Sequence, residues 1–178
     1  GRIDHALHDS NAYRALTDTK AFDEAIKLAL TKVDLTNTIV VVTADHDHTM
    51  IHHGYAARRA HGATGNSDVL GLVRSYRPAP DAGPFDLDQE KKEYTVLGFV
   101  NGQNRPANGR KSLVSTTPND AGELPDPEST VRAKDYRQES AIRMPAGGET
   151  HGGQDVALFA TGVGAGQFHG VMTNTEVF

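Results

Sequence analysis

The sequence contains no cysteine and no tryptophan. Without cysteine there is no disulfide framework, no thiol nucleophile and no cysteine-based zinc knuckle, so any metal must bind to His, Asp or Glu. Hydrophobic residues make up 37% of the chain, aromatic residues 6%, and the mean hydropathy is −0.49. This is little apolar material for an independent core of 178 residues. We therefore expect that some core partners lie outside this sequence.

The sequence also lacks a cluster of basic residues, a signal peptide and an apolar run long enough to span a membrane. Lys and Arg number 18 against 23 Asp and Glu, which gives a formal charge of −5. This balance does not indicate binding to nucleic acid or to an anionic membrane surface. Because the chain begins at Gly1 rather than at Met, we expect it to be a piece of a longer protein.

Histidine, in contrast, is frequent near the start of the chain. The apolar run 39–42 is followed directly by acids and imidazoles, which predicts a buried strand that carries polar groups to a site at its carboxyl end. Asp and His are the ligand pair that suits zinc where no thiolate is available. Of the nine histidines, six fall within the first 53 residues: His5, His8, His46, His48, His52 and His53.

Apolar residues recur at spacings of three and four after Ser10, which predicts one amphipathic helix that follows an N-cap at Asp9 or Ser10 and ends at about Thr31. Ser10 fits a helix cap better than a nucleophile, since no base lies beside it at readable spacing. A short turn then leads to a strand at 38–43, so that helix and strand form half of a βαβ unit.

Further along the chain, strands are expected at about 94–100 and 156–160. After the first of these strands, clusters of Asn, Gly, Pro and Ser interrupt every sustained period over residues 101–148. Before it, Pro78-Ala79-Pro80 indicates an extended, loop-like backbone. We expect an α/β fold, with part of a central, mostly parallel sheet flanked by helices. Residues 1–62 and 145–178 would form the catalytic core, and 63–144 an irregular, crown-like accessory insertion.

Two further segments carry chemistry. Asp4 and His8 are four residues apart, the spacing of a metal-binding pair on one helix face, although an isolated pair of this kind is more often an ordinary Asp–His hydrogen bond. His151 is followed by two glycines, which allow the backbone to approach a ligand closely. We expect His52 and His53 to be exposed or to support other ligands.

Three motifs, taken in order, resemble the carboxyl-terminal half of the alkaline phosphatase family. They are Arg2-Ile3-Asp4 with His8, Thr43-Ala44-Asp45-His46, and the stretch 149–156, Glu-Thr-His-Gly-Gly-Gln-Asp-Val. The resemblance implies a secreted or periplasmic, homodimeric hydrolase of phosphate monoesters. It also implies an α/β sheet, two zinc ions, one magnesium ion and a serine nucleophile.

The resemblance also assigns residues. Asp4, His8 and His151 look like ligands of the first zinc, and Asp45 and His46 look like ligands of the second. Three protein ligands with one open position are the pattern of a catalytic zinc, and two such ions can clamp the attacking and leaving oxygens of phosphoryl transfer. His5 stands near the expected phosphate, as a substrate-binding residue through water or as an ordinary surface histidine.

Several parts of the family pattern are missing from this sequence. The Asp-Ser-Ala motif of the nucleophile does not occur, nor do the phosphate-binding Arg and most magnesium ligands. We therefore expect the chain alone to be inactive. Two alternatives stay open: a related binuclear zinc phosphodiesterase or sulfatase, and a non-catalytic fragment that binds zinc.

Overall fold

The computed structural model describes residues 1–57, 68–75, 83–106, 109–116, 118, 122–123 and 125–177. The predicted loop Pro78-Ala79-Pro80 and the predicted domain boundary after Gly62 lie outside the described residues. The chain divides into two compact units, Gly1–Asp18 with Thr49–Thr150, and Thr19–His48 with His151–Phe178. No helix in the described part of the chain is both long and apolar enough to cross a membrane.

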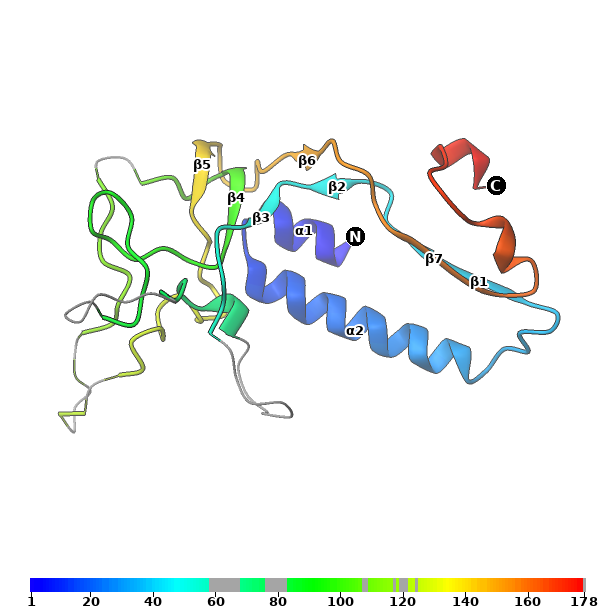
Figure 1. Cartoon of the computed structure of the whole chain (residues 1–178), viewed down its shortest axis with the longest axis horizontal. Helices are drawn as coiled ribbons and strands as arrows, with labels where there is room; N and C mark the ends of the chain where they lie inside the picture. The colour runs from blue at the N-terminus through cyan, green and yellow to red at the C-terminus, as the bar shows by residue number, and fades with distance from the viewer. Residues whose placement is uncertain are drawn as a thin grey trace. The chain divides into compact units, whose positions relative to one another are not determined.

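The first unit combines two helices with a three-stranded sheet (Figure 1). Helix α1 is Arg2–His8, and helix α2, Ala12–Leu30, begins in this unit. The sheet has the order β3 (Met50–His52), β4 (Leu97–Gly102) and β5 (Ser140–Arg143), with β3–β4 antiparallel and β4–β5 parallel. Apolar residues from the helices and from β4 form the core, including Ala6, Leu7, Ala12, Ala15, Leu97 and Phe99.

The junction of α1 and α2 corrects the predicted helix cap. Asn11, not Asp9 or Ser10, accepts the backbone N–H of Arg14 on its side-chain oxygen, at 2.9 Å. A cap of this kind contributes about 1 kcal/mol. Ser10 is fully buried and has a φ of 54°, in the left-handed region. Ser10 therefore adopts the left-handed backbone conformation of the tight turn after α1, and the next residue, Asn11, is the N-cap of α2.

A buried glutamate holds the loops around the sheet of the first unit. Glu128 is 3% exposed and accepts the backbone N–H of Leu72 at 2.7 Å. Its second oxygen accepts from Arg74 at 2.8 Å and from Arg132 at 2.6 Å. A charge so deeply buried requires this pairing. These contacts join loop segments more than 50 residues apart in the sequence.

Tyr94 gives this unit a specific dependence on alkaline pH. Burial and the hydrogen bond that its hydroxyl donates to Asp86, at 2.6 Å, raise the pKa of Tyr94 to about 12. The folded state thus holds the phenol proton more tightly than the unfolded state. The resulting stabilisation is fully present below about pH 10, the ordinary tyrosine pKa, and is lost as the pH rises through 12.

We expect the absorbance titration of tyrosinate to contain a step near pH 12 that disappears in Tyr94→Phe, while Tyr136, whose pKa is also raised by burial, keeps its own step in both proteins. The free energy of unfolding of the wild type should fall more steeply above pH 10 than that of the variant. A titration in which Tyr94 ionises with an ordinary pKa would contradict the expectation.

The second unit contains two short antiparallel strand pairs. Strand β1, Ile39–Thr43, pairs with β7, Leu158–Gly162, and β2, Asp47–His48, pairs with β6, His151–Gly152 (Figure 1). Near the carboxyl end there are 3₁₀ turns at Ala165–Gln167 and Asn174–Glu176.

The fold is therefore α/β with mixed sheets, as expected in class, but its strand directions differ from the prediction. Among the described strands, only β4 and β5 pair in parallel. The apolar run of β1 was assigned to a βαβ unit because continuous β-branched residues are typical of parallel strands. In the structure this run pairs antiparallel with β7, with Val41 opposite Ala160.

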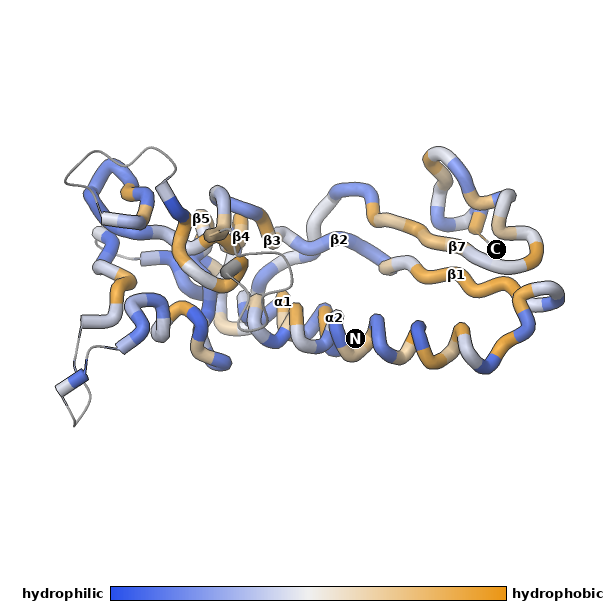
Figure 2. Tube along the Cα trace, turned by 60° about the horizontal axis from the view of Figure 1, so that its bottom comes forward, coloured by the Kyte–Doolittle hydropathy of each residue, from blue (hydrophilic) through white to orange (hydrophobic). Residues whose placement is uncertain are grey.

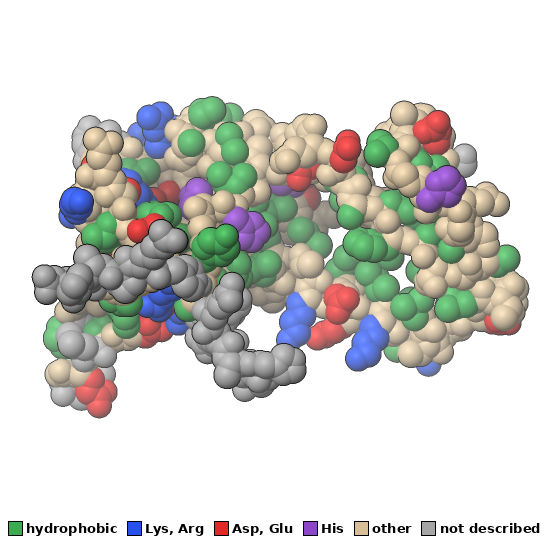
Figure 3. Space-filling model, viewed as in Figure 1, with side chains coloured by type: hydrophobic (Ala, Val, Ile, Leu, Met, Phe, Trp, Pro, Cys, Tyr) green, Lys and Arg blue, Asp and Glu red, His purple; other side chains and the backbone are tan. Residues whose placement is uncertain are grey.

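Strands β1 and β7 leave apolar side chains at the surface. Figure 2 colours most of β1 and the first part of β7 as hydrophobic. Figure 3 shows apolar side chains on the surface in the part of the view that these strands occupy in Figure 1. Ile39 is 38% exposed, Val41 36% and Phe159 68%. A two-stranded ribbon is marginally stable alone. This pair has the composition of strands in the interior of a larger sheet.

Candidate metal centre

Helix α1 places Asp4 and His8 one turn apart on the same face, as their spacing predicted. The Nε2 atom of His8 lies 3.3 Å from Oδ1 of Asp4. Both side chains are partly exposed, at 30% for His8 and 28% for Asp4. The helix thus presents a nitrogen and an oxygen side by side, with access from solvent.

The orientation of the His8 ring follows from its other nitrogen. Nδ1 lies 2.5 Å from the main-chain oxygen of Glu149. A carbonyl oxygen only accepts, so Nδ1 carries the proton of this bond. In the neutral ring, Nε2 then points a lone pair at the Asp4 carboxylate. Two such acceptors attract each other only with a proton or a cation between them.

Glu149 itself is a residue that the sequence analysis left without a role. It is 1% exposed, and its Oε1 accepts the backbone N–H of Thr49 at 2.9 Å and the Thr49 hydroxyl at 2.6 Å. Its Oε2 lies 3.8 Å from Nδ1 of His8. Glu149 therefore fixes the segment whose carbonyl holds His8. Its position two residues before His151 in the third motif was the available signal.

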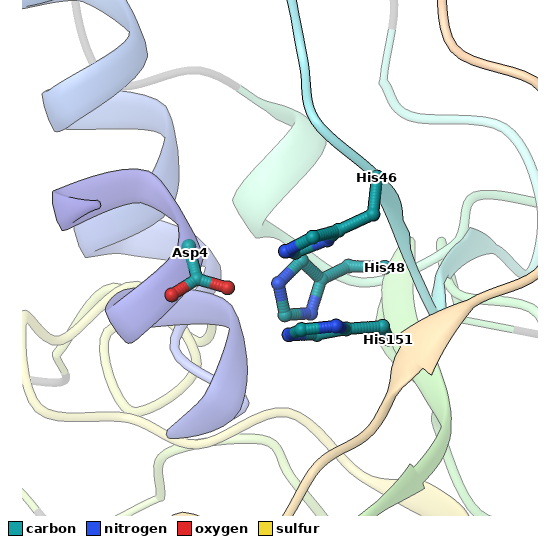
Figure 4. A group of neighbouring side chains, drawn as sticks. All are labelled: Asp4, His46, His48 and His151. Atoms are coloured by element: carbon teal, nitrogen blue, oxygen red, sulfur yellow. The ribbon is translucent and has the colours of Figure 1, made fainter. Parts of the chain in front are cut away.

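Three histidines gather in the second unit (Figure 4). The register of β2 and β6 places His48 opposite His151. The rings of His46 and His151 stack with centroids 3.4 Å apart, and the His48 ring lies 5.3 Å from His46 and 5.1 Å from His151. Each ring offers one nitrogen, and these atoms lie within 4.8 Å of one another. They could act as nitrogen donors to a metal.

The acids around these histidines have different environments. The Asp45 side chain is 89% exposed, with Oδ2 at 3.7 Å from Nε2 of His46. Asp47 instead accepts a hydrogen bond from Gln154 at 3.2 Å. A Cβ atom at Gly152 would overlap the Asp47 carboxylate. The glycine therefore allows the backbone to approach Asp47 closely. Of these two acids, Asp45 is thus the one whose carboxylate oxygens are accessible to solvent.

Three further histidines, His5, His52 and His53, have other surroundings. His5 is 74% exposed, and its Nε2 lies 3.9 Å from Oδ2 of Asp4. His52 is exposed. His53 has Nδ1 3.0 Å from the Thr95 carbonyl, and its ring occupies the space beside Gly98. His53 is exposed as well, so the expectation of exposure is confirmed for both His52 and His53.

The donor set suits zinc. It consists of imidazole nitrogens and carboxylate oxygens, which bind zinc at about 2.0–2.2 Å. Two ligands of a tetrahedral ion at such lengths are about 3.3 Å apart. The measured separation of His8 Nε2 and Asp4 Oδ1, 3.3 Å, agrees with this value. The proton on Nδ1 of His8 leaves its other nitrogen available as the ligand.

The fold and these side chains describe an α/β protein with clustered candidate metal ligands. The chain belongs to the alkaline phosphatase family, because the sequence profile of that family, described as "Alkaline phosphatase", matches residues 1–178. This confirms the resemblance that the three motifs indicated.

Individual relatives agree with the family. The chain is 35% identical over 177 residues to the membrane-bound alkaline phosphatase of Bombyx mori, covering 99% of this chain. It is 35% identical over 172 residues to the tissue-nonspecific isozyme of Rattus norvegicus and 33% identical to that of Homo sapiens, covering 96% of this chain in both. In each case it spans 27% of the relative's length.

Proposed function

We propose that this chain is the portion of an alkaline phosphatase that supplies most protein ligands of two zinc ions, and that the complete protein hydrolyses phosphate monoesters. The observation that carries the proposal is the pair Asp4 and His8, with Nε2 of His8 facing the carboxylate at 3.3 Å and Nδ1 held by the Glu149 carbonyl. Family membership supports the reaction class.

The ligand assignment follows the family motifs. Asp4, His8 and His151 would bind the first zinc, and Asp45 and His46 the second. The exposed carboxylate of Asp45, next to Nε2 of His46, supports the second set. The rings of His46 and His151 stack with centroids 3.4 Å apart, which supports two zinc sites that lie close to each other.

The contribution of this chain to catalysis is the positioning of these donors. When bound, two zinc ions would stabilise negative charge on the attacking and leaving oxygens of phosphoryl transfer. The chain holds His8 in one orientation through the Glu149 carbonyl, so its ligand atom is in place before a metal arrives. His5, exposed beside Asp4, would contact the substrate phosphate through water.

The complete protein would supply the rest. We propose that its remaining chain contributes the serine nucleophile, the phosphate-binding Arg and most ligands of one magnesium ion. It would also complete a central, mostly parallel sheet around β1 and β7, whose exposed Val41 and Phe159 support this assignment. Residues 63–144 would form the crown-like insertion. A homodimer in the periplasm or outside the cell follows from the family resemblance.

The test compares substrates on the full-length phosphatase that carries this sequence. We expect a phosphate monoester to be cleaved faster than a phosphodiester or a sulfate ester, and a chelator to abolish this activity. Faster cleavage of the diester or the sulfate ester would refute the proposal in favour of a related binuclear enzyme. The isolated chain should bind zinc without turnover, because the nucleophile is missing; measurable turnover would refute that part.

A further inference from the structure

Asn101 is a polar residue at the end of the apolar face of β4. Side chains two residues apart point to the same face of a strand, so Asn101 shares its face with Leu97 and Phe99, which are both 1% exposed. The strand lies between β3 and β5 in the sheet of the first unit (Figure 1). Asn101 lies outside the three family motifs. A half-buried amide at such a position needs a polar partner.

The amide of Asn101 holds Thr150 through two hydrogen bonds. Its Oδ1 accepts the backbone N–H of Thr150 at 2.9 Å, and its Nδ2 donates to the Thr150 hydroxyl at 2.8 Å. A backbone N–H only donates, so the atom that faces it must be the amide oxygen, and this determines which way the amide is turned. Two bonds from one planar group set both the position and the orientation of the Thr150 backbone.

These two bonds complete a closed ring of contacts between three segments of the chain. Val100, the residue before Asn101, donates its backbone N–H to the Thr49 carbonyl at 3.0 Å. Thr49 in turn donates from its backbone N–H and its hydroxyl to Oε1 of Glu149, at 2.9 and 2.6 Å. The ring closes because Glu149 precedes Thr150 in the chain. All of these residues lie in the first unit, which therefore holds the segment of Glu149 from two sides.

The carbonyl that orients His8 belongs to the peptide group that Asn101 binds. Nδ1 of His8 lies 2.5 Å from the Glu149 carbonyl oxygen. The C=O of residue 149 and the N–H of residue 150 are the two ends of one peptide group, and this N–H donates to Asn101. A peptide group is planar and rigid, with its C=O and N–H in opposite directions. Holding the N–H end therefore fixes the direction of the C=O end, and with it the bond to His8.

We propose that Asn101 is a positioning residue for the first zinc ion. It acts through the peptide group that joins Glu149 to Thr150. The carbonyl of this group holds Nδ1 of His8, which leaves Nε2 facing Asp4. Hydrogen bonds at both ends of one peptide group also polarise it, so that each strengthens the other. The inference rests on the proposed function, because it takes Asp4 and His8 as ligands of this zinc.

The first experiment measures zinc binding and needs no catalysis. The full-length protein that carries this sequence is loaded with zinc and titrated with a chelator of known affinity, and the release of each zinc ion is followed. In Asn101→Ala we expect the Kd of one zinc ion to rise about tenfold or more, the usual effect of losing a group that orients a metal ligand. The Kd of the other zinc ion should stay close to the wild-type value. Wild-type affinity for both ions would overturn the proposal, and so would an equal loss of both.

Two further positions separate the orientation of His8 from a simple loss of stability. Asn104→Ala is the matched control, because the Asn104 amide also donates a hydrogen bond just after β4, but to the Arg137 carbonyl, at 2.6 Å. This variant should lose about as much stability in denaturant unfolding as Asn101→Ala and keep wild-type zinc affinity. Thr150→Ser keeps the hydroxyl and should bind zinc as the wild type does, whereas Thr150→Val lacks it and should fall between the wild type and Asn101→Ala. An Asn104→Ala variant that loses zinc affinity as Asn101→Ala does would contradict a specific role.

A second experiment distinguishes failure of this inference from failure of the proposed function. Activity of the full-length protein toward a phosphate monoester is measured as the zinc concentration is raised. Asn101→Ala should need about tenfold more zinc for half-maximal activity and should approach the wild-type kcat at saturation, because every proposed ligand is still present. If the wild type neither binds zinc nor cleaves the monoester, the proposed function is refuted. If it does both and Asn101→Ala needs no more zinc than the wild type, only the positioning role is refuted.

Discussion

Replacement of His151 by alanine in the full-length protein is expected to lower kcat/KM for a phosphate monoester by about a thousandfold or more and to reduce the bound zinc. The expectation follows from the proposed role of His151 as a ligand of the first zinc. Loss of metal charge stabilisation costs several kcal/mol in the transition state, and each 1.4 kcal/mol is about tenfold in rate. Steady-state kinetics and elemental analysis of the purified protein measure the two effects.

The matched control for this change is His52→Ala. His52 belongs to β3 and is exposed, so its variant should keep wild-type zinc content and activity to within about twofold. Addition of excess zinc should restore part of the activity of His151→Ala if the defect is metal affinity. Wild-type zinc content and wild-type activity in His151→Ala would contradict the ligand assignment.

The second large effect is expected at Glu149. Truncation in Glu149→Ala removes the buried acceptor of two Thr49 hydrogen bonds and opens a cavity, which should lower the free energy of unfolding by about 2–4 kcal/mol. The segment that carries the Glu149 carbonyl then no longer holds His8 firmly. We expect zinc affinity to fall about tenfold or more, as is usual when a group that orients a metal ligand is lost.

Two variants separate these consequences of the Glu149 change. Glu149→Gln keeps an acceptor oxygen toward Thr49, so its loss of stability should be clearly smaller than that of Glu149→Ala. Glu24→Ala, at an exposed site on α2, should change neither property. Denaturant unfolding and zinc titration measure them. Zinc affinity at the wild-type level in Glu149→Ala would show that His8 does not depend on this anchor.

The local elements of the fold were accessible from the sequence. Helix α2 extends over Ala12–Leu30, whereas the predicted helix follows a cap at Asp9 or Ser10 and ends at about Thr31. Strand β1 extends over Ile39–Thr43 against a prediction of 38–43. Both have a strong periodic or β-branched pattern, which depends only on neighbouring residues. The predicted strands at 94–100 and 156–160 appear as Leu97–Gly102 and Leu158–Gly162, displaced by two or three residues. The ends of strands depend on pairing, which has no local signal.

Contacts between segments far apart in the chain could not be predicted from the sequence. His8 and Glu149 are 141 residues apart in the chain, and the bond between them is set by how the first unit packs. The antiparallel pairing of β1 with β7 likewise depends on the path of the chain between them, which apolar composition does not specify. The cap at Asn11 depends on the tight turn at Ser10, a conformation that serine rarely adopts.

The sequence by itself determined the family and the donor chemistry. Three motifs carry the residues of the alkaline phosphatases, and the absence of cysteine restricts metal ligands to His, Asp and Glu. It also placed Asp4 and His8 on one helix face, because a spacing of four is a local property. Only the tertiary structure decided which nitrogen of His8 faces Asp4, because the Glu149 carbonyl holds the other nitrogen, and that the rings of His46 and His151 stack. These contacts depend on packing between segments far apart in the chain, and that packing cannot be predicted from residue types and local spacing alone.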